Sequence, residues 1–134
     1  MKKIMVVEDD KNLNRLVAYN LLRCGFSPES VYDGLQAQEK LANETYDIVI
    51  LDVMLPGVDG FRICKAIKED LRAYKTFVII LTARAEYEDK LYGSLLGADC
   101  YMTKPFDIKK LLGIVREVIA ARHRQRSDAG CVLV

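Results

Sequence analysis

The stretch IVILDVMLPGVDG, residues 48–60, gives the strongest indication of the fold of this chain. Its first four residues, Ile48–Leu51, are all apolar, which is typical of a central strand covered by helices on both faces. The strand ends in Asp52, and Pro56 and Gly57 then mark a turn. In open α/β sheets, ligands bind outside the carboxyl ends of the strands, so Asp52 is placed where chemistry is expected.

Four further short apolar runs lie on either side of this stretch, and segments with helical patterns separate them. The runs cover residues 4–7, 30–32, 77–81 and 100–102. Helices are expected near residues 13–24, 34–44, 61–71, 88–96 and 108–119. Strands that alternate with helices form parallel sheets. The sequence therefore predicts an α/β protein with a doubly wound, five-stranded parallel sheet and five helices.

Length and composition limit the kind of protein. A chain of 134 residues with 51% apolar residues can bury one core without staples, and a formal net charge of +1 offers no general attraction for nucleic acid. No apolar run is long enough to span a membrane. The cysteines form no CxxC pair, which favours reduced thiols in the cytoplasm over zinc or disulfides; they are Cys24, Cys64, Cys100 and Cys131.

The helical periodicity ends at about residue 121. Residues 1–121 are therefore expected to form the folded domain, and residues 122–134 a disordered tail or a linker remnant.

Charged and polar side chains follow four of the five predicted strands. Glu8 and Asp9 follow the first, Asp52 the third, Thr82 the fourth and Lys104 the fifth. Three carboxylates at one edge would repel each other without a counter-charge. An all-oxygen cluster suits Mg²⁺ better than zinc, so we expect Mg²⁺ there.

These residue types together fit phosphoryl transfer. A carboxylate such as Asp52 can attack phosphorus, while a cation and the Lys104 ammonium neutralise oxygens and the Thr82 hydroxyl donates a hydrogen bond. Each residue taken alone would more often be a solvated loop residue or a helix cap. Their joint placement at one edge carries the prediction.

As an ordered set, four segments resemble the receiver domain of two-component response regulators: MVVEDD, VILDVMLPGVDG, VIILTAR and GADCYMTKPF. The resemblance covers about residues 2 to 121 and implies a flavodoxin-like sheet of strand order 2-1-3-4-5. It also implies that the domain catalyses only its own phosphorylation and slow dephosphorylation, and is not otherwise an enzyme.

The same resemblance implies a role for each site residue. Asp52 is the acceptor of a phosphoryl group from a phosphohistidine on a sensor histidine kinase. The other implied roles are Mg²⁺ ligands at Glu8, Asp9, Asp52 and the Met54 backbone carbonyl, phosphoryl contacts at Thr82 and Lys104, and a switch aromatic at Tyr101. From the residues alone, Tyr101 would fit the core of a short strand equally well.

Two bulky side chains near these positions are expected to set how long the phosphoryl group lasts. Met54 lies two residues after the acceptor, and Arg84 lies two residues after Thr82. Both are predicted to screen water from the acyl phosphate.

The motifs of this chain are most similar to those of receivers fused to winged-helix DNA-binding domains, which commonly dimerise through charge pairs across the fourth helix, fifth strand and fifth helix. Here Lys90 would face Lys110, and Cys100 and Ile114 replace the second pair. Like charges oppose association, so a monomer or weak dimer is expected, signalling through a downstream protein partner or a missing output domain. No contact of this domain with nucleic acid or membrane is expected.

Two alternatives remain open. A haloacid-dehalogenase-like aspartyl-phosphate hydrolase also uses an Asp after an apolar strand, but it expects a second acid where this chain has Met54. A receiver-like interaction module that never takes up phosphate is the other.

Overall fold

The computed structural model describes residues 2–84 and 86–133. Its five strands form one parallel sheet of order β2-β1-β3-β4-β5, which confirms the predicted fold class and strand order. The strands are β1 (Lys3–Val7), β2 (Ser27–Val31), β3 (Ile48–Leu51), β4 (Phe77–Thr82) and β5 (Cys100–Thr103). The helices are α1 (Lys11–Arg23), α2 (Gly34–Asn43), α3 (Gly60–Glu69), α4 (Tyr87–Leu95) and α5 (Ile108–Leu133).

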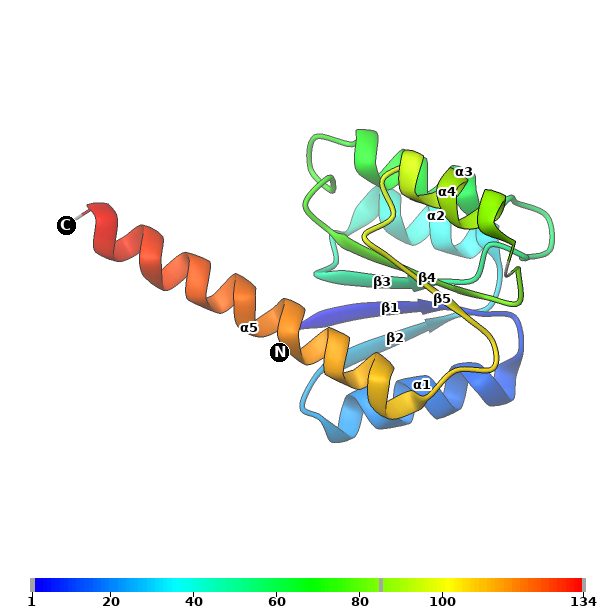
Figure 1. The fold of residues 1–134 in the computed structure, drawn as a ribbon, viewed down its shortest axis with the longest axis horizontal. Coiled ribbons are helices and arrows are strands. Elements are labelled where there is room, and N and C mark those ends of the chain that lie inside the picture. The colour runs from blue at the N-terminus through cyan, green and yellow to red at the C-terminus, as the bar shows by residue number, and fades with distance from the viewer. Residues whose placement is uncertain (1, 85, 134) are drawn as a thin grey trace.

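Helices cover both faces of the sheet (Figure 1). Helices α1 and α5 lie on one face, and α2, α3 and α4 lie on the other. Alternate residues of the central strands belong to two separate hydrophobic cores. Met5 and Val7 pack toward α2 and α3, while Ile4 and Val6 pack toward α1 and α5. This two-sided burial explains why β3 is apolar at every position.

Strand β2 begins earlier than the apolar run at residues 30–32 predicts: it starts at Ser27 and includes Pro28. It is an edge strand of the sheet, where a proline without an N–H group is tolerated. The third helix is shorter than predicted: it ends at Glu69, and Leu71 is 90% exposed instead of lying on its apolar stripe.

Helix α5 differs most from expectation. It continues to Leu133, through the segment for which a disordered tail was predicted. Residues 121–126 are mostly good helix formers, and no proline interrupts them, so local propensity favours helix even without an apolar stripe. The boundary of the folded domain at residue 121 stays a prediction. Within residues 2–84 and 86–133, no helix is both long and apolar enough to cross a membrane.

The loop between β3 and α3 is tightly packed at Gly60. A Cβ atom there would lie 2.4 Å from the Val53 Cα and 2.7 Å from the backbone oxygen of Asp52. Asp59 caps α3 by accepting a hydrogen bond from the Phe61 amide at 2.9 Å. The chain therefore turns directly from Asp52 into α3, with no space for a side chain at position 60.

Candidate functional site

The sheet brings the predicted site residues to its carboxyl edge, the side on which the strand arrows end in Figure 1. Glu8 and Asp9 follow β1, Asp52 follows β3, and Thr82 is the last residue of β4. Lys104 follows β5, and its peptide bond to Pro105 is cis. Because β1, β3, β4 and β5 are neighbours in the sheet, residues far apart in the sequence meet here.

The Lys104 ammonium bridges two of the carboxylates. Its Nζ donates to Asp52 Oδ2 at 2.9 Å and also forms an ion pair with Glu8 Oε1. Glu8 and Asp52 are each only 5% exposed, whereas Asp9 is exposed. The half-buried Lys104 ammonium thus supplies the counter-charge that two buried acids need.

Burial and hydrogen bonds act against each other on these groups. Burial raises the pKa of Glu8, although hydrogen bonds from Lys104 and the Asp10 amide oppose this. Burial alone would lower the pKa of Lys104, but its hydrogen bonds to Glu8 and Asp52 outweigh burial and raise it. Lys104 is therefore held in its charged form.

The carboxylates also satisfy the chemistry of a divalent cation site. One oxygen from each of Glu8, Asp9 and Asp52 lies within 4.8 Å of the others. Carboxylate oxygens with an open side suit Mg²⁺, which keeps several waters when it binds. The residues therefore fit the predicted cation.

Thr82 and Tyr101 lie next to the site and are linked through Arg84. The Thr82 side chain is fully buried, and its hydroxyl oxygen accepts from the Arg84 amide at 3.5 Å. The Tyr101 hydroxyl donates to the Arg84 backbone oxygen at 2.9 Å. Tyr101 is thus attached to the loop that follows Thr82, and it is not a simple core residue.

The Arg84 side chain makes contacts that the sequence did not reveal. Its guanidinium pairs with Asp89 of α4 at 2.5 Å and lies over the Phe61 ring, with 5.3 Å between the guanidinium carbon and the ring centroid. Phe61 in turn makes an edge-to-face contact with Tyr92 of α4, with ring centroids 4.9 Å apart. Arg84 therefore connects the start of α3 to α4.

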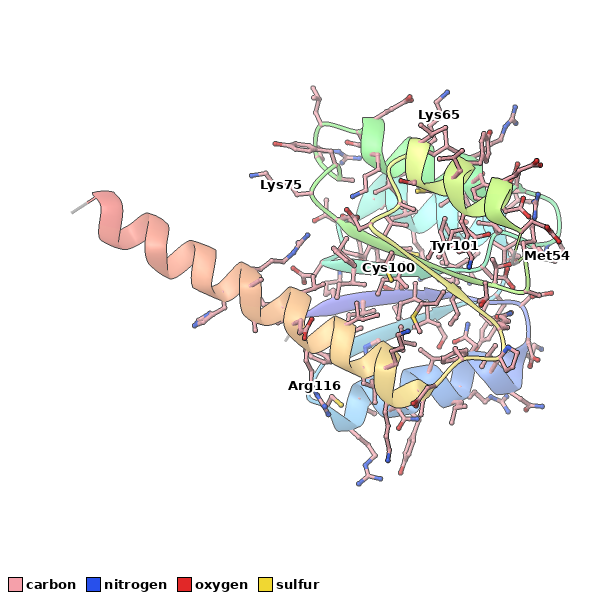
Figure 2. The ribbon with its side chains drawn as sticks, viewed as in Figure 1. Met54, Lys65, Lys75, Cys100, Tyr101 and Arg116 are labelled. Carbon is pink, nitrogen blue, oxygen red and sulfur yellow. The ribbon has the colours of Figure 1, made fainter. Side chains whose placement is uncertain are left out.

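Met54 lies at the same end of the sheet (Figure 2) and is 55% exposed. Its backbone amide donates to Asp52 Oδ1 at 2.9 Å, so the loop that carries Met54 also fixes the Asp52 carboxylate. The predicted effect of the Met54 side chain on the lifetime of the phosphoryl group stays a prediction.

Asn14 of α1 is a further residue that sequence reasoning missed. It is completely buried, and its side-chain amide donates to the backbone oxygens of Val6, Glu8 and Val31. A signal was present, because Asn14 lies three residues before Val17, on the buried face of the helix.

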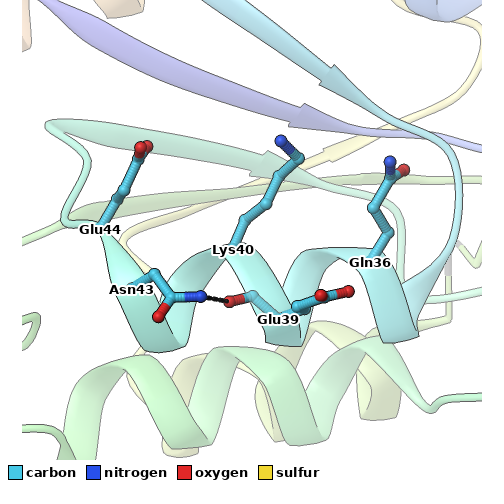
Figure 3. A pocket seen from close by; sticks show the side chains of 5 residues that line it. All are labelled: Gln36, Glu39, Lys40, Asn43 and Glu44. Atoms are coloured by element: carbon cyan, nitrogen blue, oxygen red, sulfur yellow. Dashed lines mark hydrogen bonds between the residues drawn. The ribbon is translucent and has the colours of Figure 1, made fainter.

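A polar hollow of about 360 Å³ lies on α2, away from the predicted residues (Figure 3). Lys40, one of its lining residues, pairs with Glu29, and hydrogen bonds from Lys40 and Tyr46 lower the pKa of Glu29. Asn43 donates to the Glu39 backbone oxygen at 3.0 Å. Two of its charged groups are thus engaged by residues outside the hollow, since Glu44 also pairs with Lys3.

Fold and site together define an α/β domain with a lysine-bridged acid cluster at the carboxyl edge of its sheet. The family model described as response regulator receiver domain matches residues 4–116. The chain belongs to the response regulator receiver domain family and is the receiver domain of a two-component response regulator.

Relatives of known sequence agree with this membership. The chain is 40% identical over 119 residues to the response regulator ArlR of Staphylococcus saprophyticus, covering 89% of this chain and 53% of ArlR. It is 36% identical over 138 residues to the DNA-binding dual master transcriptional regulator RpaA of Synechocystis. That match covers 97% of this chain and 57% of RpaA. The chain thus spans little more than half the length of these relatives.

The structure is also similar to that of the BeF3-activated receiver domain of DrrB, with a TM-score of 0.81 and 38% identity. The match covers 90% of this chain and 98% of that domain. DrrB is described as a Thermotoga maritima OmpR/PhoB homolog. The predicted likeness to receivers of the winged-helix transcription-factor type is therefore confirmed.

Proposed function

We propose that this receiver is a phospho-accepting signalling switch, in which Asp52 takes a phosphoryl group from a phosphohistidine of a sensor histidine kinase. The observation that carries the proposal is the Lys104 ammonium, which lies within hydrogen-bonding distance of Asp52 and is held there by Glu8. The positive charge of a cation beside the acceptor would offset the negative charge of the transferred phosphoryl oxygens.

In the transfer step, a carboxylate oxygen of Asp52 attacks phosphorus. A P–O bond forms to Asp52 while the P–N bond to the imidazole breaks, and the imidazole leaves with the electron pair of that bond. The Met54 amide orients the attacking carboxylate, and Lys104 faces the phosphoryl oxygens. Apart from this reaction and slow loss of the phosphate, we propose no enzymatic activity.

The residues that would hold Mg²⁺ are Glu8, Asp9 and Asp52, together with the Met54 backbone carbonyl. When bound, Mg²⁺ would neutralise charge between the acceptor carboxylate and the phosphoryl oxygens.

The signal would leave the site through Thr82. In this proposal the Thr82 hydroxyl donates to a phosphoryl oxygen, which draws the following loop toward the site. Tyr101 is bonded to Arg84 of that loop, and Arg84 is paired with Asp89 of α4. A shift of the loop would therefore change Tyr101 and the surface formed by α4, β5 and α5.

That surface is proposed to bind a downstream protein partner or an output domain. Apolar side chains on α4 are exposed, with Leu95 at 76% and Leu91 at 47%. Lys90 and Lys110 are both exposed, which fits a monomer or weak dimer in the cytoplasm better than a charge-paired dimer.

Acetyl phosphate with Mg²⁺ tests the function, with intact-protein mass spectrometry as the readout. We expect one phosphoryl group per chain on the native protein and none on Asp52→Asn. Continuous release of phosphate from monoesters would favour the haloacid-dehalogenase-like hydrolase instead. Absence of any labelling, with Mg²⁺ present and the fold intact, would favour the interaction module that takes up no phosphate.

The lifetime of the phosphoryl group is a separate prediction. Met54→Asn and Arg84→Glu should each speed its loss about tenfold, because smaller or acidic side chains screen water less well, a change of about 1.4 kcal/mol in the barrier. Decay of the labelled protein, followed by mass spectrometry, measures this.

Arg84→Met is the matched control, since it keeps bulk at this position but removes the ion pair with Asp89. It should decay like the native protein if screening is the cause. Native-like decay of both Met54→Asn and Arg84→Glu would contradict the screening role.

A further inference from the structure

Asn14 lies at the end of the first turn of α1, and its side chain reaches the carboxyl ends of two strands. It is 0% exposed, and its Nδ2 lies 3.1 Å from the Val6 oxygen, 3.0 Å from the Glu8 oxygen and 3.1 Å from the Val31 oxygen. A side-chain amide carries two hydrogens, so these three acceptors share them. The residue therefore connects β1, β2 and the loop that begins at Glu8.

The orientation of this amide is fixed by its surroundings. Turning it over would place Oδ1 against three backbone oxygens, which cannot donate a hydrogen bond. In the observed orientation, Asn14 Oδ1 is buried and accepts no hydrogen bond from the residues that the structure describes. A buried acceptor without a donor lowers the stability of the fold, so filling of space alone does not explain an asparagine at this position.

The contact fixes the backbone that carries the acids. The Glu8 amide donates to the Val31 oxygen at 3.0 Å, and the Glu8 carbonyl accepts from Asn14. Both backbone polar groups of Glu8 are thus held, one by β2 and one by α1. The Glu8 side chain then accepts from the Asp10 amide at 3.0 Å and pairs with Lys104, and Asp9 follows in the chain.

We propose that Asn14 is a positioning residue for the cation site, holding the Glu8 backbone so that the carboxylates of Glu8 and Asp9 converge with that of Asp52. This inference rests on the proposed function, since it concerns the cation that function requires. Groups that orient metal ligands without touching the metal typically change its affinity by about 10–100-fold when they are removed.

The test compares Asn14→Leu with Thr76→Val. Thr76 is also buried, at 3% exposure, and its hydroxyl donates to the Tyr46 oxygen at 2.8 Å. It directly precedes β4, at the amino edge of the sheet, so its replacement removes a buried hydrogen bond away from the cation site. Both variants are expected to unfold at lower urea concentration than the native protein.

Only the Asn14 variant should lose affinity for Mg²⁺, by about 10–100-fold, in a MgCl₂ titration followed by amide NMR shifts. In the metal-free protein, the amide resonances of Glu8 and Asp10 should move in Asn14→Leu and stay in place in Thr76→Val. Should Asn14→Leu fail to fold, Asn14→Ser keeps a single donor in a smaller side chain, and weaker Mg²⁺ binding is expected there as well.

Native Mg²⁺ affinity in the folded Asn14 variants would overturn the inference and leave Asn14 a purely structural residue. Failure of the proposed function has a different signature: the native protein and Thr76→Val would then take up no phosphoryl group from acetyl phosphate.

Discussion

A Lys104→Met variant is expected to be phosphorylated about 100-fold more slowly than the native protein while binding Mg²⁺ about tenfold more tightly. The rate should fall because one preorganised donor to the phosphoryl oxygens is lost, and such a loss typically costs a factor of about 10² or more. Metal affinity should rise because the Lys104 ammonium lies between Glu8 and Asp52 and repels a second cation. Labelling by acetyl phosphate and a MgCl₂ titration measure the two effects.

Lys109→Met serves as the control, since Lys109 is an exposed lysine on α5. It should leave both quantities unchanged. If Lys104→Met weakened Mg²⁺ binding as well as the rate, Lys104 would be acting mainly by maintaining the fold of the site, contrary to the electrostatic role assigned to it.

Gly60→Ala is expected to destabilise the protein by about 3 kcal/mol, near the upper end for an added methyl group in a packed interior. The new Cβ would lie 2.4 Å from the Val53 Cα, a backbone atom that cannot rotate away. The chain between Asp52 and α3 would have to move, so phosphorylation should slow as well. Urea denaturation and acetyl phosphate labelling give the two readouts.

Gly113→Ala is the matched variant, because a Cβ at Gly113 meets no atom within 4 Å and the residue lies inside α5. It should stabilise the protein by about 0.5–1 kcal/mol through helix propensity. Equal stability of the two variants would mean that the close approach at Gly60 does not constrain the loop.

The sequence predicts the central part of the fold better than its edges. Strand β3 is buried at all four positions, and its apolar run is easy to recognise. Strand β2 is buried only at Val31, so tertiary pairing with β1 sets its start, which periodicity cannot locate. Leu71 was misplaced for a similar reason: it continues the apolar spacing of α3, but the helix ends before it.

The candidate site could be predicted where its residues directly follow strands. Topology alone brings Glu8, Asp52 and Lys104 to one edge, because parallel neighbours end on the same side. The contacts of Asn14 and Arg84 could not be predicted in this way. They depend on where a side chain points across the interior or over a ring, which sequence spacing does not determine.

A phosphoryl group on Asp52 should change the surface around Tyr101. Amide NMR spectra recorded during titration with beryllofluoride and Mg²⁺ test it most directly, because beryllofluoride imitates a phosphoryl group on the carboxylate. Shifts are expected near Asp52 and also at Arg84, Tyr101 and α4, and all of them should be absent in Asp52→Ala. Shifts confined to the neighbourhood of Asp52, or shifts that persist in Asp52→Ala, would contradict it.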